Sequence, residues 1–422
     1  MKFQGWYVLA ALWVVGFVSQ AFTNYGAGVI NAVMARDLGL DRGSLGLGFT
    51  LFMLGQGVTG PAVAWSVNRH GARRVMIVGT LGIALGGIGL ATLASQAWHY
   101  VLLFGVVVGV ATGASGTIPI QTCATLWFER RRAVALAVVL TANSVGGFVV
   151  APLLGWIILM AGGNWRAGWL FVAVAAVLVS LVSWRFVRNS PAEIGQLADG
   201  GPSDQPEAAV GKASAIHRSA TDWPWRQAIR TPAMWFCILA AVGFNVPAFV
   251  FMAHVVPHLE DLGHSPLMGG AALGSLALSG ALGKLAAGFL CDRFEPRLIW
   301  CWALCLAAGG VALAVVANSI ALIYLFAAMI GFGYGASIVC WPAMVANYFG
   351  AGAFATTMGV QMVFKTILAS MAPYLVGVSF DLHGSYALAF GVVSAFVLVS
   401  GLALLLARPP TPYSVYNLEV SS

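Results

Sequence analysis

The chain has very few charged residues for its length. Asp, Glu, Lys and Arg make up 8% of the 422 residues, whereas hydrophobic residues make up 60%. Soluble globular domains carry about 25% charged residues, because charge is needed to cover a surface in water. The shortage therefore excludes an ordinary soluble protein and indicates that the lipid bilayer is the surrounding solvent.

Acidic residues and cysteines are also scarce. All 14 Asp and Glu residues can be placed in loops, in a linker or at the ends of apolar segments. The six cysteines lie within or at the ends of apolar runs, and we interpret them as reduced packing residues. The sequence contains no P-loop, nucleophile triad or Cys/His cluster. We therefore expect no enzyme activity, no cofactor and no metal site, and transport that is not driven directly by ATP.

Long apolar runs make up most of the sequence. Each is about 20 residues long, which is the length that crosses a hydrocarbon core. The first run follows Trp6 directly and has no cleavage site, so we expect an uncleaved helix. The sequence predicts an all-α membrane protein with twelve transmembrane helices, near residues 6–31, 44–67, 74–95, 99–127, 132–161, 165–187, 231–257, 266–291, 297–317, 319–348, 352–379 and 385–407.

A polar stretch divides the twelve helices into two sets of six. Residues 188–230 are rich in Pro, Gly and acids and cannot bury a core, so we predict a linker. The predicted organisation is a bundle over 1–187, a cytoplasmic linker over 188–230, a second bundle over 231–408 and a cytoplasmic tail over 409–422. Of 21 Lys and Arg residues, 16 fall in one set of loops and termini and three in the opposite loops. This asymmetry predicts that both termini lie in the cytoplasm, in a bacterial inner membrane.

Two loops have similar sequences and resemble a motif of a known family. Residues 68–74 follow the second span, and residues 292–297 follow the eighth. The sequence here resembles the major facilitator superfamily, whose loop motif is G-x-x-x-D-R-x-G-R-[RK]. The first copy departs from the motif, with Ala64 and Asn68 in place of Gly and Asp. The resemblance implies two pseudo-symmetric six-helix bundles and a conformational role for these residues: Arg69, Gly71, Arg73, Arg74, Gly288, Asp292, Arg293 and Arg297.

Further stretches resemble one branch of that superfamily, the monocarboxylate transporters and oxalate:formate antiporters. They are Gly5-Trp6-Tyr7, residues 127–133, residues 190–193 and Tyr348-Phe349-Gly350. The resemblance implies alternating access and a preference for carboxylates. It also implies that cationic residues in the eighth and eleventh helices hold the substrate. Lys365 matches the lysine of the eleventh helix, whereas Lys284 departs from the arginine that is usual in the eighth.

Lys284 and Lys365 also stand out from the residues alone, because they lie inside predicted spans. A lysine near the bilayer centre costs about 2.5–3.5 kcal/mol to insert, and no acidic residue is expected near the centre of any span. We interpret the two lysines as contacts for a visiting anion. The alternative for Lys284 is that its stem reaches the membrane interface by snorkelling; for Lys365, each interface is about 20 Å away along the helix.

Polar and aromatic residues at helical spacing extend this candidate substrate site. Each could instead be an interhelical hydrogen-bond partner or a packing residue. The full set of candidate substrate-binding residues is Lys284, Lys365, Gln361, Asn143, Gln121, Asn24, Tyr334 and Trp341.

Glycine seams and a group of histidines complete the pattern. We expect Gly105, Gly109 and Gly113, and likewise Gly331, Gly333 and Gly335, to allow close helix approach.

His254 is expected near the outer end of the seventh helix, and His258 and His264 just beyond it. With Glu260 and Asp261 these histidines suggest a polar extracytoplasmic loop, and a metal site is the alternative.

The sequence thus predicts a secondary transporter of small organic anions, mono- or dicarboxylates, acting as a monomer in the lipid bilayer without nucleic acid. The anion would screen the lysines and let the two halves rock around it. A lysine with a lowered pKa would give proton symport, whereas permanently charged lysines would give exchange against a counter-anion. The alternatives are a drug or metabolite exporter of the same fold, favoured by Val149-Val150-Ala151-Pro152 and Gly155, and a receptor on a transporter fold.

Overall fold

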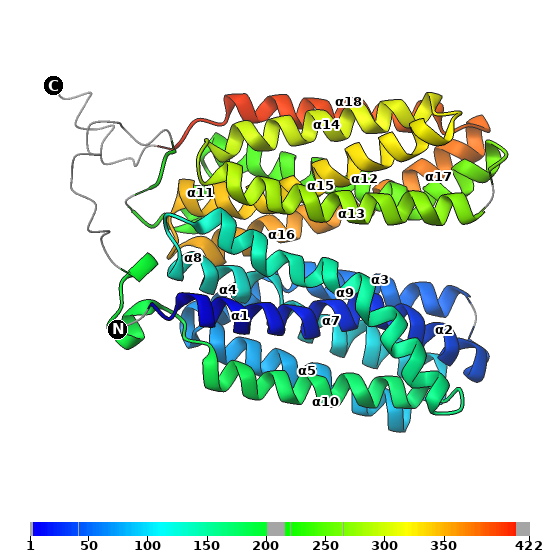
Figure 1. The fold of residues 1–422 in the computed structure, drawn as a ribbon, viewed down its shortest axis with the longest axis horizontal. Helices are drawn as coiled ribbons and strands as arrows, with labels where there is room; N and C mark the ends of the chain where they lie inside the picture. Colours follow the sequence, from blue (N-terminus) through cyan, green and yellow to red (C-terminus); the bar gives the residue numbers. More distant parts are fainter. Residues whose placement is uncertain (1–2, 41, 201–215, 220, 265, 411–422) are drawn as a thin grey trace. The chain divides into compact units, whose positions relative to one another are not determined.

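The computed structural model describes residues 3–40, 42–200, 216–219, 221–264 and 266–410 (Figure 1). Throughout these ranges the regular structure is helical and no strand occurs. This confirms the expected all-α fold class. The middle of the predicted linker, 201–215 and 220, lies outside the described residues, as do residues 411–422 of the predicted tail.

Helices before the predicted linker follow one another with short breaks. The first span, Gly5–Leu38, contains a π-helical segment over Phe17–Gly26, and the span Ala97–Trp127 contains another over Val101–Val108. The helices are α1 (Gly5–Gly16), α2 (Ala27–Leu38), α3 (Arg42–Val58), α4 (Gly60–His70), α5 (Ala72–Leu93), α6 (Ala97–Tyr100), α7 (Gly109–Ser115), α8 (Thr117–Trp127), α9 (Arg132–Met160) and α10 (Trp165–Phe186).

The second half of the chain has fewer and longer helices. A short helix, α11, precedes them within the predicted linker, and two 3-10 turns over Pro191–Ile194 and Ala198–Gly200 lie at the other end of that linker. The helices are α11 (Trp225–Ala228), α12 (Pro232–Asp261), α13 (Pro266–Cys291), α14 (Pro296–Val316), α15 (Ile320–Phe349), α16 (Phe354–Ser370), α17 (Ala372–His383) and α18 (Ala387–Ala403).

The described helices are long and apolar enough to cross a membrane many times. Ten helical stretches meet that condition by themselves, and α3 with α4 forms an eleventh that is bent by 45°. Helix α9 has 29 residues with a charge only at Arg132. At 1.5 Å per residue it is about 40 Å long, which suffices for a twelfth span. The chain is therefore a multi-pass membrane protein.

Breaks inside three spans differ from the continuous helices that we expected. Helix α3 ends just before Thr59, α16 ends just before Met371, and α7 and α8 meet at Gly116. Proline explains two of them, because Pro61 and Pro373 occupy the first turn of the helix that follows and supply no N–H to the helix before. At Gly116 the backbone is not helical, with φ −100° and ψ −125°.

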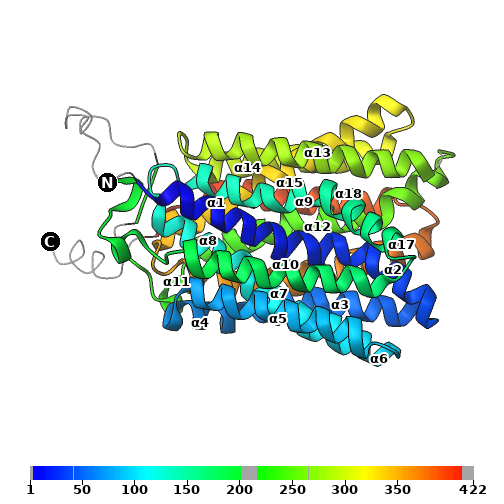
Figure 2. The same ribbon diagram turned by 60° about the horizontal axis from the view of Figure 1, so that its bottom comes forward.

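The described residues divide into two compact units. Unit 1 is Met1–Ala208 with Met358–Ile367, and unit 2 is Ala209–Thr357 with Leu368–Ser422. In unit 1, α5 packs along α10 and α7. In unit 2, α13, α15, α14 and α18 form a series of neighbours, as Figures 1 and 2 show, and α12 packs against α13, α15 and α18. The predicted domain boundaries remain predictions.

Glycines allow the closest helix contacts in both units. A Cβ added at Gly109 would lie 2.8 Å from the Cα of Phe52 on α3, and one at Gly335 would collide with the carbonyl oxygen of Gly280 on α13. These contacts confirm the two predicted small-residue seams. They also fix which faces of α13 and α15 meet, and these two helices carry several of the candidate site residues.

The ends of the predicted linker are attached to the helix ends. In unit 1, the carbonyl oxygen of Arg188 accepts from Trp127 Nε1 at 2.9 Å, and Asp199 Oδ2 accepts from the backbone N–H of Glu129 at 2.9 Å. In unit 2, Trp223 N donates to the carbonyl of Phe349 at 2.9 Å, and Asp222 Oδ1 accepts from Gly352 N at 2.8 Å. Each unit therefore holds its own end of the linker.

Candidate functional site

Lys284 lies on α13, in the part of unit 2 where α13 and α15 approach most closely. Its side chain is only 5% exposed. Gly280, one turn earlier, contacts Gly331 and Gly335, and Gly283 contacts the carbonyl of Phe332. The glycines bring the α15 backbone next to the turn that carries Lys284. This burial argues against snorkelling, because a side chain that reaches the membrane interface would be more exposed.

Aromatic rings gather on α12 and α15 in the same unit. The ring centroid of Phe244 lies 5.7 Å from that of Tyr334 and 5.8 Å from that of Trp341. Phe244 and Trp341 are buried, and Tyr334 is half-buried. The structure thus brings the two predicted aromatic residues into one cluster. It adds Phe244, which sequence reasoning missed because it is one of many apolar residues of α12.

Lys365 and Gln361 lie one turn apart on α16, in the segment that belongs to unit 1. Gln361 is fully buried and Lys365 is half-buried. Within this unit, the segment approaches α4 closely, since a Cβ at Gly359 would lie 2.8 Å from the carbonyl oxygen of Gly60. The two lysines therefore belong to different units, and each contributes a charge within a membrane-spanning helix.

Asn24 forms part of a hydrogen-bonded group in unit 1. Its Nδ2 donates to the carbonyl of Gln20 at 2.6 Å, and its Oδ1 accepts from Gln56 Nε2 on α3 at 3.4 Å. Gln20 Nε2 in turn donates to the carbonyl of Thr112 on α7 at 3.3 Å. Asn24 therefore takes part in interhelical hydrogen bonding, the alternative noted from the sequence. Gln56 was missed, although a polar residue within an apolar run was a usable signal.

Two other predicted amides present oxygens to the interior of unit 1. Gln121 on α8 is 2% exposed, and Asn143 on α9 is half-buried. Among the described residues, nothing donates a hydrogen bond to Gln121 Oε1 or Asn143 Oδ1. Buried amide oxygens are normally satisfied by a partner or by water. Both positions can accordingly accept a hydrogen bond from water or from a bound molecule.

The first motif loop joins α4 to α5 around Gly71. Gly71 has φ +84°, a conformation that favours glycine, and a Cβ there would meet the side chain of Asn189. Asn189 Oδ1 accepts from the backbone N–H of Arg73 at 2.8 Å. The Arg69 guanidinium lies 5.4 Å from the Trp65 ring centroid, and Arg74 is exposed. The predicted linker therefore supplies a side chain that holds this loop, a contact that sequence reasoning missed.

The second motif copy joins α13 to α14. Gly288 is buried on α13, Asp292 is half-buried and Arg293 is exposed. Arg297 NH1 donates to the carbonyl of Ala407 at 3.2 Å. Arg297 thus connects the start of α14 to the chain that follows α18. All predicted motif residues lie in the described part of the chain, and their conformational role remains a proposal.

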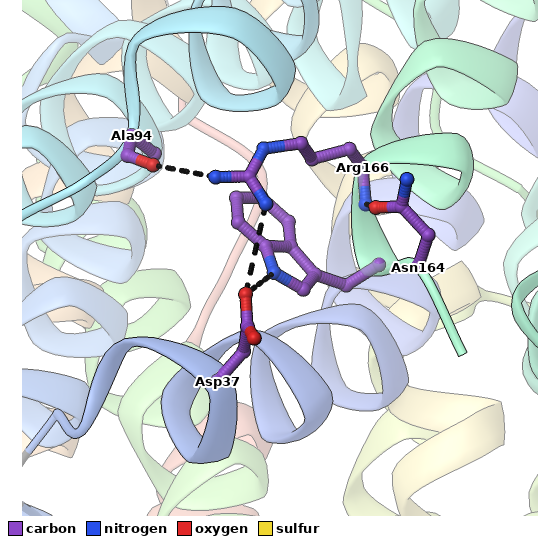
Figure 3. Close-up of polar contacts among 5 residues, drawn as sticks. Asp37, Ala94, Asn164 and Arg166 are labelled. Atoms are coloured by element: carbon purple, nitrogen blue, oxygen red, sulfur yellow. Dashed lines mark hydrogen bonds and ion pairs between the residues drawn. The ribbon is translucent and has the colours of Figure 1, made fainter. Parts of the chain in front are cut away.

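In unit 1, the carboxylate of Asp37 joins the ends of several helices (Figure 3). Asp37 Oδ2 at the end of α2 accepts from Trp165 Nε1 at 2.8 Å and lies 3.6 Å from Arg166 NH1 on α10. Arg166 NH2 also donates to the carbonyl of Ala94 after α5, at 3.4 Å. This cluster fixes α2, α5 and α10 relative to one another.

We expect the indole hydrogen bond to stabilise this cluster more than the ion pair does. Trp165 is buried, so Asp37→Ala leaves its N–H unsatisfied and is expected to cost about 1–3 kcal/mol. Asp37→Asn keeps an oxygen acceptor and removes only a partly exposed ion pair, worth about 0–1 kcal/mol. Melting temperatures in detergent should therefore fall clearly for the alanine variant and slightly for the asparagine variant. Equal losses would assign the stabilisation to charge.

His254 lies within the seventh span, as the sequence suggested, whereas His258 lies inside the helix and not beyond it. His254 and His258 both lie within α12, which continues past Pro257 to Asp261. The apolar run predicts an end to this span near residue 257, and the helix is four residues longer. Within the described residues, no three His, Cys, Asp or Glu side chains are arranged to hold a metal ion.

Comparison with known proteins agrees with this architecture. The sequence matches the family model of the Major Facilitator Superfamily over residues 12–373 and again over 250–419. A rat (Rattus norvegicus) protein named monocarboxylate transporter 13 is 26% identical over 349 residues, covering 81% of this chain and 74% of that protein. An uncharacterised MFS-type transporter of Bacillus subtilis strain 168, YcxA, is 23% identical over 415 residues, covering 94% and 93% respectively.

Solved structures of transporters share the fold. FucP in its outward conformation matches with a TM-score of 0.73 at 14% identity, covering 96% of this chain and 100% of that chain. The human organic anion transporter MFSD10 matches with a TM-score of 0.69 at 16% identity, covering 95% and 99%. At these identities the likeness concerns the fold alone. Because the family match extends over more than half of the sequence, the chain belongs to the Major Facilitator Superfamily, a family of membrane transporters for small molecules.

Proposed function

We propose that this transporter moves small organic anions, mono- or dicarboxylates, by alternating access. The observation that carries the proposal is the position of two lysines within membrane-spanning helices, Lys284 on α13 and Lys365 on α16. Placing such a charge within the membrane costs about 2.5–3.5 kcal/mol, so an ionisable residue there points to a functional site. The similarity to a monocarboxylate transporter at 26% identity supports the same class of substrate.

Other groups within each of the two units suit a small, partly apolar anion. The described carboxylates lie in loops or at helix ends. Lys284 and Lys365, by contrast, put positive charge within the membrane-spanning helices. The rings of Phe244, Tyr334 and Trp341 offer an apolar surface in unit 2. In unit 1, the amides of Gln121 and Asn143 could bind a substrate hydroxyl or a water molecule. A charged contact and an apolar wall together are typical of sites for small ligands.

Two forms of coupling follow from the chemistry of a lysine. A lysine that loses its proton when the site is empty would take up a proton together with the anion, giving symport. A lysine that keeps its charge would disfavour closure of the empty site, so that a second anion must return, giving exchange. The drug or metabolite exporter remains the alternative function.

Loop charges support an orientation for the protein. The excess of Lys and Arg in one set of loops supports a topology with both termini and the linker on the cytoplasmic side of a bacterial inner membrane. In this proposal residues 1–187 and 231–408 are the two bundles, which move against each other as a monomer around the motif loops.

Counterflow in proteoliposomes tests the proposed cargo. Vesicles loaded with unlabelled lactate or oxalate should accumulate the labelled acid, whereas protein-free vesicles should not. A neutral sugar and a quaternary ammonium drug, tested in the same way, should not accumulate. Accumulation of the cation without the acids would contradict the proposal and favour the exporter. Stimulation by an inward proton gradient in the absence of internal anion would identify symport, and a strict need for internal anion would identify exchange.

A further inference from the structure

Two cysteines of unit 2 face each other across the contact between α13 and α15. Cys291 is the last residue of α13, and Cys340 lies within α15. Their sulfur atoms are 3.2 Å apart, and the two residues are only 2% and 0% exposed. Both cysteines are free thiols. The proposed transport of anions gives neither residue a role.

The packing of the two helices keeps the sulfur atoms together. Gly280, Ala287 and Cys291 share one face of α13, because they lie two turns and then one turn apart. At one end of this face Gly280 meets the backbone of Gly335 on α15, and Ala287 is buried in the middle. At the other end Cys291 meets Cys340. Contact at both ends of the face leaves the helices little freedom to separate or rotate.

The geometry of this pair suits a disulfide. An S–S bond is about 2.05 Å long, so the sulfur atoms of Cys291 and Cys340 need to approach by only about 1 Å. Cys301 and Cys305, another pair in unit 2, lie four residues apart on α14. Residues with that spacing have Cβ atoms about 5–6 Å apart, whereas a disulfide needs about 3.5–4.5 Å. The α14 pair therefore cannot form the bond without distortion of its helix.

The end of α13 gives a reagent access to the buried pair. Cys291 ends the helix, and two residues later Arg293 is exposed. Helix ends open more readily than helix centres, so the thiol of Cys291 can meet a small disulfide molecule. Its sulfur bonds to one sulfur of that molecule, and the other half leaves as a thiol with the proton. The sulfur of Cys340 then displaces the remaining half in the same way. Two protein thiols are thus oxidised to one disulfide, and the two electrons reduce the reagent to two thiols.

We infer that Cys291 and Cys340 form a modification site, a dithiol that small disulfides oxidise to a disulfide. The new bond links α13 to α15 directly before the loop that carries the second motif copy. It joins residues 49 positions apart, and such a bond stabilises a protein chiefly by restricting its unfolded chain. The site depends only on the packing of unit 2 and is independent of the proposed cargo.

Oxidation of the purified protein in detergent tests the site. The probe is 2,2′-dithiodipyridine, a small apolar disulfide, and the remaining thiols are alkylated in denaturant before digestion without reductant. Mass spectrometry should then find one peptide pair joined through Cys291 and Cys340, which dithiothreitol separates. The melting temperature of the oxidised protein should rise by about 5–10 °C, because the new bond closes a long loop.

Single substitutions assign the effect to this pair. Cys291→Ser and Cys340→Ser should each abolish both the joined peptides and the rise in melting temperature. Cys301→Ser removes a cysteine from the α14 pair and is the matched control, so it should leave both results unchanged. If a buried serine prevents folding, Cys291→Ala and Cys340→Ala replace these variants without burying a hydroxyl group.

Three results would overturn the inference. Cys291 and Cys340 could both remain free after the half-buried Cys305 has reacted completely. Cys291 could retain one half of the probe without joining Cys340, which would show that the sulfur atoms are not neighbours. The rise in melting temperature could also persist in Cys340→Ser. Counterflow plays no part in these measurements, so their failure would leave the proposed function intact, and a lack of carboxylate transport would leave the dithiol site intact.

Discussion

Replacing Lys365 by alanine is expected to reduce counterflow of a labelled carboxylate by about 10- to 100-fold. The loss corresponds to one hydrogen bond to a charged group, about 1.5–3 kcal/mol. Lys284→Ala should have an effect of similar size, because this side chain is nearly fully buried on α13. Counterflow in proteoliposomes measures both variants, and each preparation must first show the elution profile and melting temperature of the unsubstituted protein.

Variants that keep or remove the charge separate the role of charge from that of packing. Lys284→Arg should retain much of the transport, since arginine is usual at this place in the oxalate:formate antiporters that the sequence resembles. Lys365→Gln should behave like Lys365→Ala, because glutamine keeps a long polar side chain but not the charge. Arg226→Gln removes an exposed cation from α11 and serves as the matched control, with no expected change. Unchanged uptake in both lysine-to-alanine variants would refute the proposed function.

Most of the fold could be predicted from the sequence, because the bilayer imposes a simple rule. A span needs about 20 apolar residues, and backbone groups in lipid must bond within the helix, so composition and length locate the spans. The breaks at Thr59, Gly116 and Met371 were not predicted. Gly60-Pro61 and Ala372-Pro373 precede further apolar residues, so hydropathy alone shows no end to the helix there.

The candidate site could be predicted only in part. Lys284, Lys365 and Gln361 were identifiable because polar groups stand out in apolar runs. Phe244 was not, since a phenylalanine in such a run gives no signal. The contacts of Asn189 with Arg73 and of Cys291 with Cys340 join residues 116 and 49 positions apart. Such pairs depend on how helices pack, and one sequence does not specify that.

Gly335→Ala is expected to destabilise unit 2 strongly, although it adds a single methyl group. A Cβ at Gly335 would overlap the backbone of Gly280 on α13, and backbone atoms cannot rotate away as a side chain can. Helices α13 and α15 must then separate, and an overpacked contact of this kind costs about 1–3 kcal/mol. A lower melting temperature in detergent and a smaller yield of monodisperse protein should follow.

Gly274→Ala is the matched control on α13. No atom lies within 4 Å of a Cβ added at Gly274, so the methyl group enters open space. Alanine favours a helix over glycine by about 0.5–1 kcal/mol, and this variant should melt at the same temperature or slightly higher. If Gly335→Ala melts like Gly274→Ala, the helices are not in backbone contact. Transport should fall with stability in Gly335→Ala, because α13 carries Lys284 and α15 carries Tyr334 and Trp341. Close packing of these two helices thus positions a charged residue and an aromatic surface within one unit.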